Sequence, residues 1–411
     1  MEWPMTDGDN SDLRPRPGPL RGTTVIDMTR ALAGPHAAML LGDLGAHVIK
    51  VESAAGDESR SWGPPFIGDG DDDRVSTYFL AANRNKQSFQ LDLKSGDDIS
   101  LLIRLVRHAD VLMENFRPGV LERLGLPPER LLDINPKLVV LSITGLGHDG
   151  PEGARPGYDQ IAQGEAGLMS ITGPPGEPTR VGVPIADLLA GIYGAYGTLA
   201  AILRARETGE GAIVRTSLLA AICGVHSFQA TRFLVGGENP VSSGNHHPSI
   251  APYGTFTASD GIIQIAAAND RLWSALAHEL RIDPTATEFA TNQARVAHRA
   301  ELIESIETRL TSNTSDHWID VITAAGVPCG RVRSIEDVYE WPQALSQGLV
   351  IQVEHETAGR LNLPGSPVRI ENRDGADLMP SWHLPPPGLG EHNRAVRDWL
   401  DQRDSIDNQK H

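Results

Sequence analysis

The stretch TTVIDMTRALAGPHAAMLLGDLGAHVIKVE, Thr23 to Glu52, decides the fold class of this chain. It begins with TTVIDM (23–28), a short run rich in β-branched and apolar residues that predicts a strand. Residues 35–44 have the spacing of a helix, and AHVIKVE (46–52) predicts a second strand. A strand, a helix and a strand in this order are typical of a parallel sheet with crossover helices.

The same alternation continues through the first half of the chain. SFQLDL (88–93), VLMEN (111–115) and KLVVLSITG (137–145) predict strands, and 97–109 has helical spacing of its apolar residues. The nearly continuous apolar character of these runs suits strands that are buried on both faces. We therefore expect an α/β fold with a parallel sheet covered by helices on both sides.

The longest apolar run is LLAGIYGAYGTLAAIL, from Leu188 to Leu203. It is shorter than the ~20 residues that a membrane-spanning helix needs, so we interpret it as a buried helix. Gly191, Gly194 and Gly197 recur at every third residue, although glycine lowers helix stability. This repeat predicts tight packing of the helix against a sheet or another helix.

The pattern of predicted elements changes at about residue 245, where a loop-rich stretch begins. IIQIAAA (262–268) predicts a strand, and three helical patterns follow at 271–280, 296–310 and 316–325. PCGRVRS then predicts a strand or turn. These elements indicate a smaller α+β domain at 245–335.

Composition limits the classes of partner and compartment. The 411 residues carry a net charge of −17, which argues against broad nucleic-acid binding. Two cysteines, Cys223 and Cys329, give no disulfide framework or zinc spacing and are typical of reduced, partly buried thiols in a cytosolic protein. The first twenty residues lack the apolar segment of a signal peptide. We expect a cytoplasmic protein without nucleic-acid or membrane partners.

Two segments resemble ligand-binding corners. LGDLGAHVIKVE follows a strand and a helix, but no GxGxxG is present, so structural glycines explain it better than NAD binding. No Walker loop and no GxSxG are present, so ATP and hydrolase chemistry lack their usual signals. In ENFRPGVLERLGL (114–126), Arg117 and Arg123 flank a turn and helix, where arginines either bind phosphates or remain solvated.

Asp187 and three histidines are the remaining candidates for chemistry. Asp187 precedes the long apolar helix, where aspartate is a favoured N-cap. A carboxylate kept ionised by a helix N-terminus is also able to act as a nucleophile, and the two roles are compatible. His226, His246 and His247 lack a metal-ligand pattern, so no metal is expected.

Eight segments of the chain occur in the order that one enzyme family shows: DMTRALAGPHAAMLLGDLGAHVIKVE, NRNKQSFQLDLK, ADVLMENFRPGVLERLGL, GLGHDGPEGARPGYDQ, GLMSITG, VGVPIADLLAGIYG, TGEGAIVRTSLLAA and GNHHPSIAPYGTF. On these segments the chain, from about Leu20 to Leu400, resembles the family III CoA-transferases. This family, also called CaiB/BaiF, includes formyl-CoA transferase, carnitine CoA-transferase and α-methylacyl-CoA racemase.

The resemblance implies an architecture. It implies a large Rossmann-like domain built from both chain ends, a small α+β domain, and an interlocked homodimer. The domain boundaries that we expect on this basis are a disordered arm at 1–19, the large domain at 20–225, a linker at 226–244, the small domain at 245–335, and a return to the large domain with the C-terminal tail at 336–411.

The resemblance also implies an activity, the transfer of coenzyme A from a donor acyl-CoA to an acceptor carboxylic acid. The reaction would pass through an aspartyl anhydride and an aspartyl-CoA thioester, without metal, NAD or ATP. The family's nucleophile falls on Asp187, and Tyr158 falls where the family lines the pantetheine end of the ligand. The other implied CoA-binding positions are Arg30, Ala31, Leu32, Ala33, Leu91, Lys94, Asn115, Phe116, Arg123 and Leu124.

Three departures from the family pattern bear on the substrate. Leu32 stands where formyl-CoA transferase has a glutamine, and GNHHPSIAPYG replaces its glycine-rich loop, which argues against formyl-CoA and oxalate. Tyr158 stands where the racemase branch has a histidine, and a tyrosine with a pKa of about 10 is a poor base for an α-carbon. An acyl-CoA racemase or isomerase and a non-catalytic CoA-binding protein are therefore the alternatives to a transferase.

Overall fold

The computed structural model describes residues 16–68 and 74–409, in two compact units. Unit 1 comprises the described residues within Met1–Ala166, Gly182–Ser227 and Gln343–His411, and unit 2 comprises Gly167–Val181 and Phe228–Pro342. Most of the arm expected at 1–19 lies outside the described residues. Arg16, however, is buried and donates hydrogen bonds to Asn85 and to the carbonyl of Gly42.

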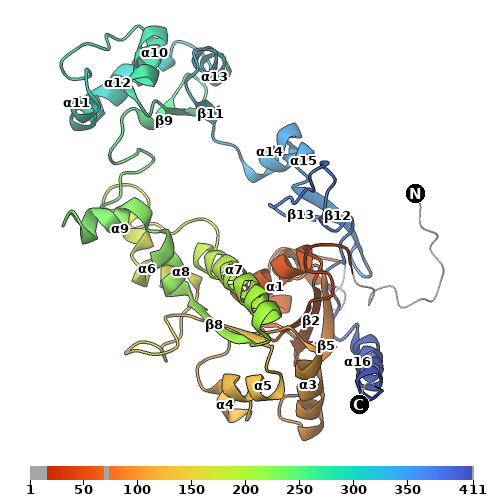
Figure 1. Ribbon diagram of the computed structural model, residues 1–411. Helices are drawn as coiled ribbons and strands as arrows, with labels where there is room; N and C mark the ends of the chain where they lie inside the picture. The colour runs from red at the N-terminus through yellow and green to blue at the C-terminus, as the bar shows by residue number, and fades with distance from the viewer. Residues whose placement is uncertain (1–15, 69–73, 410–411) are drawn as a thin grey trace. The chain divides into compact units, whose positions relative to one another are not determined.

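Unit 1 is built on a six-stranded parallel sheet (Figure 1). Its strand order is that of the doubly wound Rossmann-like sheets, in which the order reverses between the first and fourth strands. The mixed α/β fold with a central parallel sheet, which the sequence predicted, is confirmed. In spatial order the strands are β5 (Lys86–Gln90), β2 (His47–Glu52), β1 (Thr24–Asp27), β6 (Val111–Glu114), β7 (Val139–Thr144) and β8 (Ala212–Ser217).

The strand predicted at 88–93 is displaced in the structure. β5 ends at Gln90, and the chain then turns at Asp92, whose carbonyl accepts a hydrogen bond of 2.8 Å from the amide of Ser95. Leu91 and Leu93 pack against the hydrophobic core. Apolar residues that follow a strand can be buried in the core just as apolar residues of the strand are. Hydrophobicity alone therefore did not locate the end of the strand.

Helices α1 (Ala33–Asp43) and α7 (Ile185–Thr208) pack together on one face of the sheet (Figure 1). A Cβ at Gly191 would lie 2.7 Å from the carbonyl oxygen of Ala33, and one at Gly197 would lie 2.8 Å from Val214. The predicted tight packing is therefore confirmed, against both a helix and the sheet. α7 extends beyond the predicted 188–203 at both ends.

The length and composition of α7 also match those of a membrane-spanning helix. Among the described residues it is the one helix that is long and apolar enough to cross a membrane. Core helices of soluble proteins pass the same test, and 39% of its most apolar window is buried inside the structure. The buried side of α7 is explained by α1 and the sheet.

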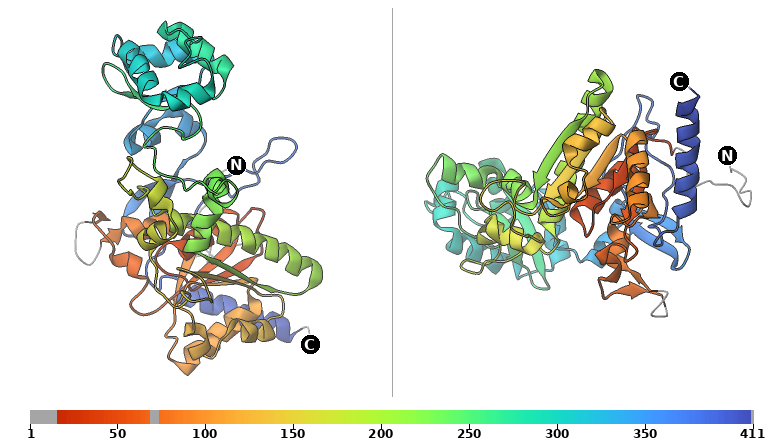
Figure 2. Two further views of the ribbon diagram at one scale, coloured as in Figure 1. Left: turned by 90° about the vertical axis from the view of Figure 1, so that its left-hand side faces the viewer. Right: turned by 90° about the horizontal axis from the view of Figure 1, so that it is seen from below.

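The helices on the opposite face of the sheet come from the first third of the chain and from its C-terminal end. α3 (Gly96–His108), α5 (Pro128–Ile134) and α16 (Asn393–Asn408) enclose one apolar core there. α16 lies alongside α3 (Figure 2), and Arg104 pairs with Asp401 and Asp404 at 2.6 and 2.7 Å. The C-terminal helix therefore belongs to the fold of unit 1.

Shorter elements complete unit 1. The hairpin of β12 and β13 packs Val353, Leu361 and Leu363 against Leu80. The bounds of these elements are β3 (Phe66–Ile67), β4 (Val75–Ser76), α2 (Thr77–Ala82), α4 (Val120–Arg123), α6 (Asp159–Glu165), α8 (Leu218–Val225), α15 (Pro342–Ser346), β12 (Val350–His355) and β13 (Gly359–Pro364).

Unit 2 is an α+β structure with its own core, centred on Trp273. The helix predicted at 296–310 is confirmed over 299–310, but its predicted start is wrong, because His298 separates this helix from a preceding one that ends at Ala297. The expected linker contains helix α9 (Ser227–Leu234). The other elements are the antiparallel strands β9 (Tyr253–Thr257), β10 (Ile262–Ala266) and β11 (Cys329–Arg331), and helices α10 (Asp270–Leu280), α11 (Asn292–Ala297), α12 (Arg299–Leu310), α13 (Ser315–Ala324) and α14 (Ile335–Glu340).

The contact at Gly191 gives a stability prediction. Gly191→Val would drive a branched side chain into the backbone of α1, and overpacking of this kind costs about 1–3 kcal/mol. We expect the free energy of unfolding to fall by that amount, as measured by urea unfolding monitored by circular dichroism. Gly96→Ala is the control, because a Cβ there would meet open space rather than another element. An equal loss in both variants would contradict the packing role of Gly191.

Candidate functional site

A pocket of about 580 Å³ opens in unit 1 where the strand order reverses. Its walls come from the loops after β1, β6 and β7 and from the start of α7. This is the place where open parallel sheets bind ligands, and the volume suits a small-molecule site. Eight of the predicted site residues line it, namely Arg30, Ala31, Leu32, Ala33, Asn115, Phe116, Tyr158 and Asp187.

Asn115 connects the two loops on either side of the strand reversal. Its Oδ1 accepts a hydrogen bond of 2.9 Å from the amide of Arg30, and its Nδ2 donates one of 2.8 Å to the carbonyl of Arg30. β1 and β6 are neighbouring parallel strands, so their carboxyl ends lie at the same edge. One side chain after β6 therefore fixes the loop after β1.

Asp187 lies in the first turn of α7, at its third residue. The N-cap is Pro184, so the prediction that Asp187 caps this helix is wrong. Asp159 of α6 acts on the helix start instead, because its Oδ1 accepts hydrogen bonds from the amides of Ala186 at 2.7 Å and Asp187 at 3.4 Å. The Asp187 carboxyl group is consequently left to face the pocket.

The surroundings of Asp187 alter its acidity. The expectation that the helix N-terminus keeps Asp187 ionised is wrong, because burial raises the pKa of Asp187 to about 7 and the negative charge of Asp159 adds to this effect. Burial, with the charges of Asp187 and Asp159, raises the pKa of Tyr78 to about 12. Near neutral pH the pocket therefore holds a partly ionised carboxyl group close to a protonated phenol, which is a hydrogen-bond donor.

Four predicted residues are not among those lining the pocket. Leu91 is 2% exposed and packs in the core, and Leu124 packs against the same core. Lys94 and Arg123 are exposed on the surface of unit 1. A role of these four in binding the distal part of a long ligand stays a prediction.

The pocket also contains residues that sequence reasoning missed. Trp62 and Tyr78 line it and pack edge to face, with ring centroids 4.8 Å apart. They lie in the segment between β2 and β5, where no motif singled them out. Asp159 follows Tyr158 directly in GARPGYDQ, so its position beside a predicted site residue was the one available signal.

Three arginines give the pocket positive charge. They are Arg30, Arg117 and Arg155, which line it. In residues 16–68 and 74–409, no cluster of three or more His, Cys, Asp or Glu side chains is placed to hold a metal ion. Neither cysteine forms a disulfide, and Cys223 is exposed rather than partly buried.

Comparison with protein families gives one match that covers most of the chain. Residues 20–393 match the model of CoA-transferase family III. The chain is 38% identical to succinyl-CoA:glutarate CoA-transferase of Homo sapiens, over 92% of this chain and 85% of that protein. It is also 38% identical to succinate–glutarate CoA-transferase of Agrobacterium fabrum, over 94% of this chain and 96% of that protein.

A solved structure supports the same relationship. The crystal structure of a CaiB/BaiF family protein from Brucella suis superimposes with a TM-score of 0.82 at 39% identity. The match covers 94% of this chain and 100% of that one. The similarity therefore extends over both units rather than over the parallel sheet alone.

The raised pKa of Asp187 predicts a pH dependence of stability. Between pH about 4 and about 7 the folded protein retains a proton that an aspartate in the unfolded chain has lost. Unfolding therefore releases a proton, and this group makes stability fall as pH rises through that window. We expect the melting temperature of Asp187→Asn to fall less than that of the wild type. The test is to measure the melting temperatures of both proteins at several pH values. If the two plots of melting temperature against pH are parallel, the raised pKa is contradicted.

Proposed function

The chain belongs to CoA-transferase family III, and from that membership we propose that it transfers coenzyme A between carboxylic acids with Asp187 as nucleophile. The observation that carries the proposal is the position of Asp187. Its carboxyl group faces the same pocket as the predicted CoA loop, Arg30 to Ala33. No other aspartate among the described residues combines this position with the matching family motif VGVPIADLLAG.

The first half of the reaction removes the donor acid. The ionised Asp187 carboxylate attacks the thioester carbonyl of the donor acyl-CoA and expels the CoA thiolate, which leaves a mixed anhydride. The thiolate then attacks the aspartyl carbonyl of that anhydride. This step gives an aspartyl-CoA thioester and releases the donor as a free carboxylate.

The second half follows the same steps in reverse. The acceptor carboxylate attacks the aspartyl-CoA carbonyl, which forms a new anhydride and frees the thiolate again. Attack of the thiolate on the acceptor's acyl carbon yields the new acyl-CoA and regenerates Asp187. One thioester replaces another, so the reaction has a small net free-energy change and consumes no ATP.

The start of α1 supports this mechanism. Leu32, its N-cap, and Ala33, its first residue, line the pocket, and Leu32 supplies no side-chain hydrogen bond to the first-turn amides. Amides at a helix N-terminus favour negative charge. We assign to them the stabilisation of the oxyanion that forms when the thioester carbonyl is attacked.

For the substrates we propose succinyl-CoA as donor and a short dicarboxylic acid as acceptor. The names of two relatives at 38% identity, which specify succinate or succinyl-CoA and glutarate, support this choice. The arginines of the pocket match the anionic groups of such substrates. Leu32 makes the site less polar than a glutamine would at that position.

Covalent labelling tests the proposal. Incubation with a panel of acyl-CoAs that includes succinyl-CoA, followed by quenching with hydroxylamine or borohydride, should modify Asp187 as seen by peptide mass spectrometry. Asp187→Ala should lose transferase activity entirely and keep its circular dichroism spectrum, because the nucleophile is removed and the helix remains.

A matched control is available in another helix. Asp97 lies in the first turn of α3 and is exposed, so Asp97→Ala should retain both labelling and turnover. Transfer activity retained by Asp187→Ala would refute the nucleophile. Binding of CoA without any adduct, together with exchange of the α-hydrogen in deuterated water, would favour an isomerase.

We further propose that the protein is a homodimer, with α7 in the interface. Ile192, Tyr196 and Leu203 are 47%, 71% and 67% exposed and follow the spacing of one helix face. Leu199, between them, is partly exposed. A continuous apolar stripe on a helix supports a protein contact.

A charge on that stripe tests the dimer. Tyr196→Asp should shift the mass in light scattering from two chains toward one at micromolar concentration, because burial of the charge is costly. Thr208→Asp, at the exposed end of the same helix, is the control and should remain dimeric. A wild-type mass of one chain would overturn the proposal.

A further inference from the structure

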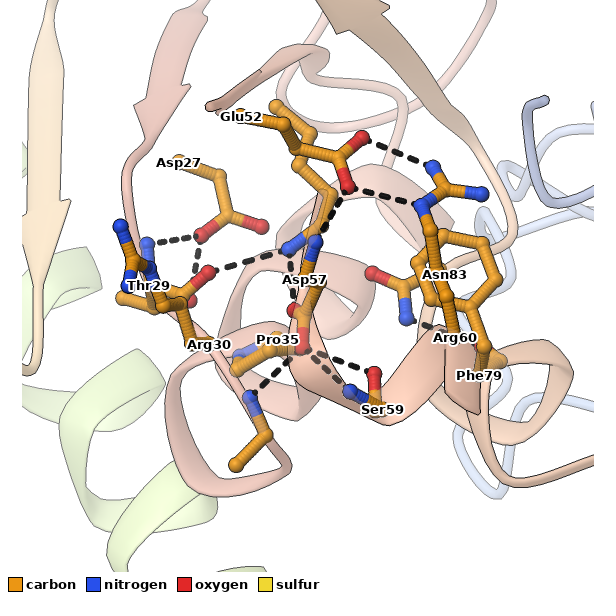
Figure 3. A network of polar contacts seen from close by, with 12 residues as sticks. Asp27, Thr29, Arg30, Pro35, Glu52, Asp57, Ser59, Arg60, Phe79 and Asn83 are labelled. Carbon is orange, nitrogen blue, oxygen red and sulfur yellow. Dashed lines mark hydrogen bonds and ion pairs between the residues drawn. The ribbon is translucent and has the colours of Figure 1, made fainter. Parts of the chain in front are cut away.

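A cluster of buried charges lies beneath the loop that connects β1 to α1 (Figure 3). From its contacts we infer that the Lys50–Asp57 ion pair is a positioning device, which holds the Arg30–Ala33 loop in its acyl-CoA-binding shape before the ligand arrives. This inference rests on the proposed function, because it assigns the loop to acyl-CoA. Neither Lys50 nor Asp57 lines the pocket, so both act through the loop.

The cluster is electrically balanced. Lys50 pairs with Asp57 at 2.8 Å and Lys86 with Asp27 at 2.9 Å, and all four side chains are fully buried. Glu52 and Arg60 form a third pair at 2.8 Å at its edge (Figure 3). Three cations therefore match three anions: Lys50, Lys86 and Arg60 against Asp27, Glu52 and Asp57.

The two lysines hold the backbone on either side of the loop, at Thr29 before it and at Pro35 in the first turn of α1. Lys50 donates a hydrogen bond of 3.0 Å to the carbonyl of Thr29, and Lys86 donates one of 2.8 Å to the carbonyl of Pro35. Asp27 accepts a hydrogen bond of 3.0 Å from the amide of Thr29. The backbone between these anchors forms no sheet ladder, so side chains replace the hydrogen bonds that a strand would supply.

Asp57 holds the middle of the loop. Its Oδ1 accepts a hydrogen bond of 3.1 Å from the amide of Ala31, which has a φ of +65°. That left-handed conformation is unfavourable for a non-glycine residue and persists only where surrounding contacts impose it. Together with Asn115, which bonds both backbone groups of Arg30, Asp57 fixes the loop at consecutive residues.

Asp57 is itself rigidly held. It bonds Lys50 through Oδ2, and its Oδ1 also accepts hydrogen bonds from the amide and hydroxyl of Ser59 at 3.0 and 2.9 Å. Its own amide donates to Glu52 at 3.0 Å, and Glu52 is fixed by Arg60. The position of the Ala31 amide is thereby tied to β2, which carries both Lys50 and Glu52.

Energetics explain why the cluster points to positioning. Buried ion pairs contribute little net stability, because desolvation of the charges offsets their attraction, and apolar residues of similar size are often as stabilising. What apolar residues do not provide is a donor for Thr29 and an acceptor for Ala31. A preformed loop lowers the ordering cost of binding, so the cluster should act on ligand affinity.

The decisive variant removes both charges of the pair. Lys50→Met/Asp57→Leu keeps the cluster neutral and the side-chain volumes similar, but it releases Thr29 and Ala31. We expect the Kd for free CoA, measured by isothermal titration calorimetry, to rise about tenfold or more. The KM for acyl-CoA should rise with it, whereas kcat should change less, because Asp187 keeps its own supports.

A second buried pair provides the matched control. Arg84 and Asp43 are 3% and 2% exposed, and their hydrogen bonds of 2.9 and 2.5 Å join them to each other near the end of α1. Arg84→Met/Asp43→Leu should lose stability without changing the Kd for CoA. Equal CoA affinity in the folded Lys50→Met/Asp57→Leu variant and the wild type would overturn the inference. An equal loss of CoA affinity in both double variants would also overturn it.

Hydrogen exchange on the wild type decides the question if the double variant does not fold. A peptide spanning 28–36 should exchange slowly in the free protein, because the amides of Thr29, Arg30 and Ala31 are bonded without ligand. Fast exchange that slows only when CoA is added would show that the ligand orders the loop, and would overturn the inference.

The outcomes also separate this inference from the proposed function. Normal CoA binding without an Asp187 adduct would contradict the transferase mechanism and leave the loop measurements valid. An adduct, together with unchanged CoA affinity in the folded Lys50→Met/Asp57→Leu variant, would contradict the loop inference alone. A wild-type protein that does not bind CoA would contradict both.

Discussion

The reversal of strand order between β1 and β6 is the constraint on which the rest of unit 1 depends. The chain leaves these neighbouring strands in opposite directions, which opens a crevice at their carboxyl ends. The loops that line this crevice cannot continue a sheet ladder, so their backbone groups need other partners. Asn115 and the buried charges beneath the first loop meet that need at Arg30 and Ala31.

The chemistry of the pocket follows from how α7 enters it. Tight packing at Gly191 sets the helix against α1, which brings Asp187 beside the loop after β1. Asp159 satisfies the first amides of α7 and at the same time opposes the ionisation of Asp187. Burial is the main cause of the raised pKa of Asp187, and the same neighbour that holds the start of the helix adds to it through its negative charge.

Local patterns located most of the framework correctly. β-branched runs such as the one in β1 mark strands because such side chains fit a pleated, buried surface. The glycine repeat of α7 indicated close packing, because only a missing side chain permits it. Local patterns failed where tertiary contacts replace local ones, as at the start of α7, where an aspartate of another helix receives the amides that a local cap would bind.

By itself the sequence determined the alternation of strands and helices, and the resemblance of its motifs selected Asp187 and the loop around Ala31. Only the tertiary structure decided that Trp62, Tyr78 and Asp159 share their pocket, and that Lys50 and Asp57 lie beneath it. The physical reason is that periodicity reports which face of an element is buried. The partner of a buried charge, however, depends on which distant segments meet, and that is settled only when the chain folds.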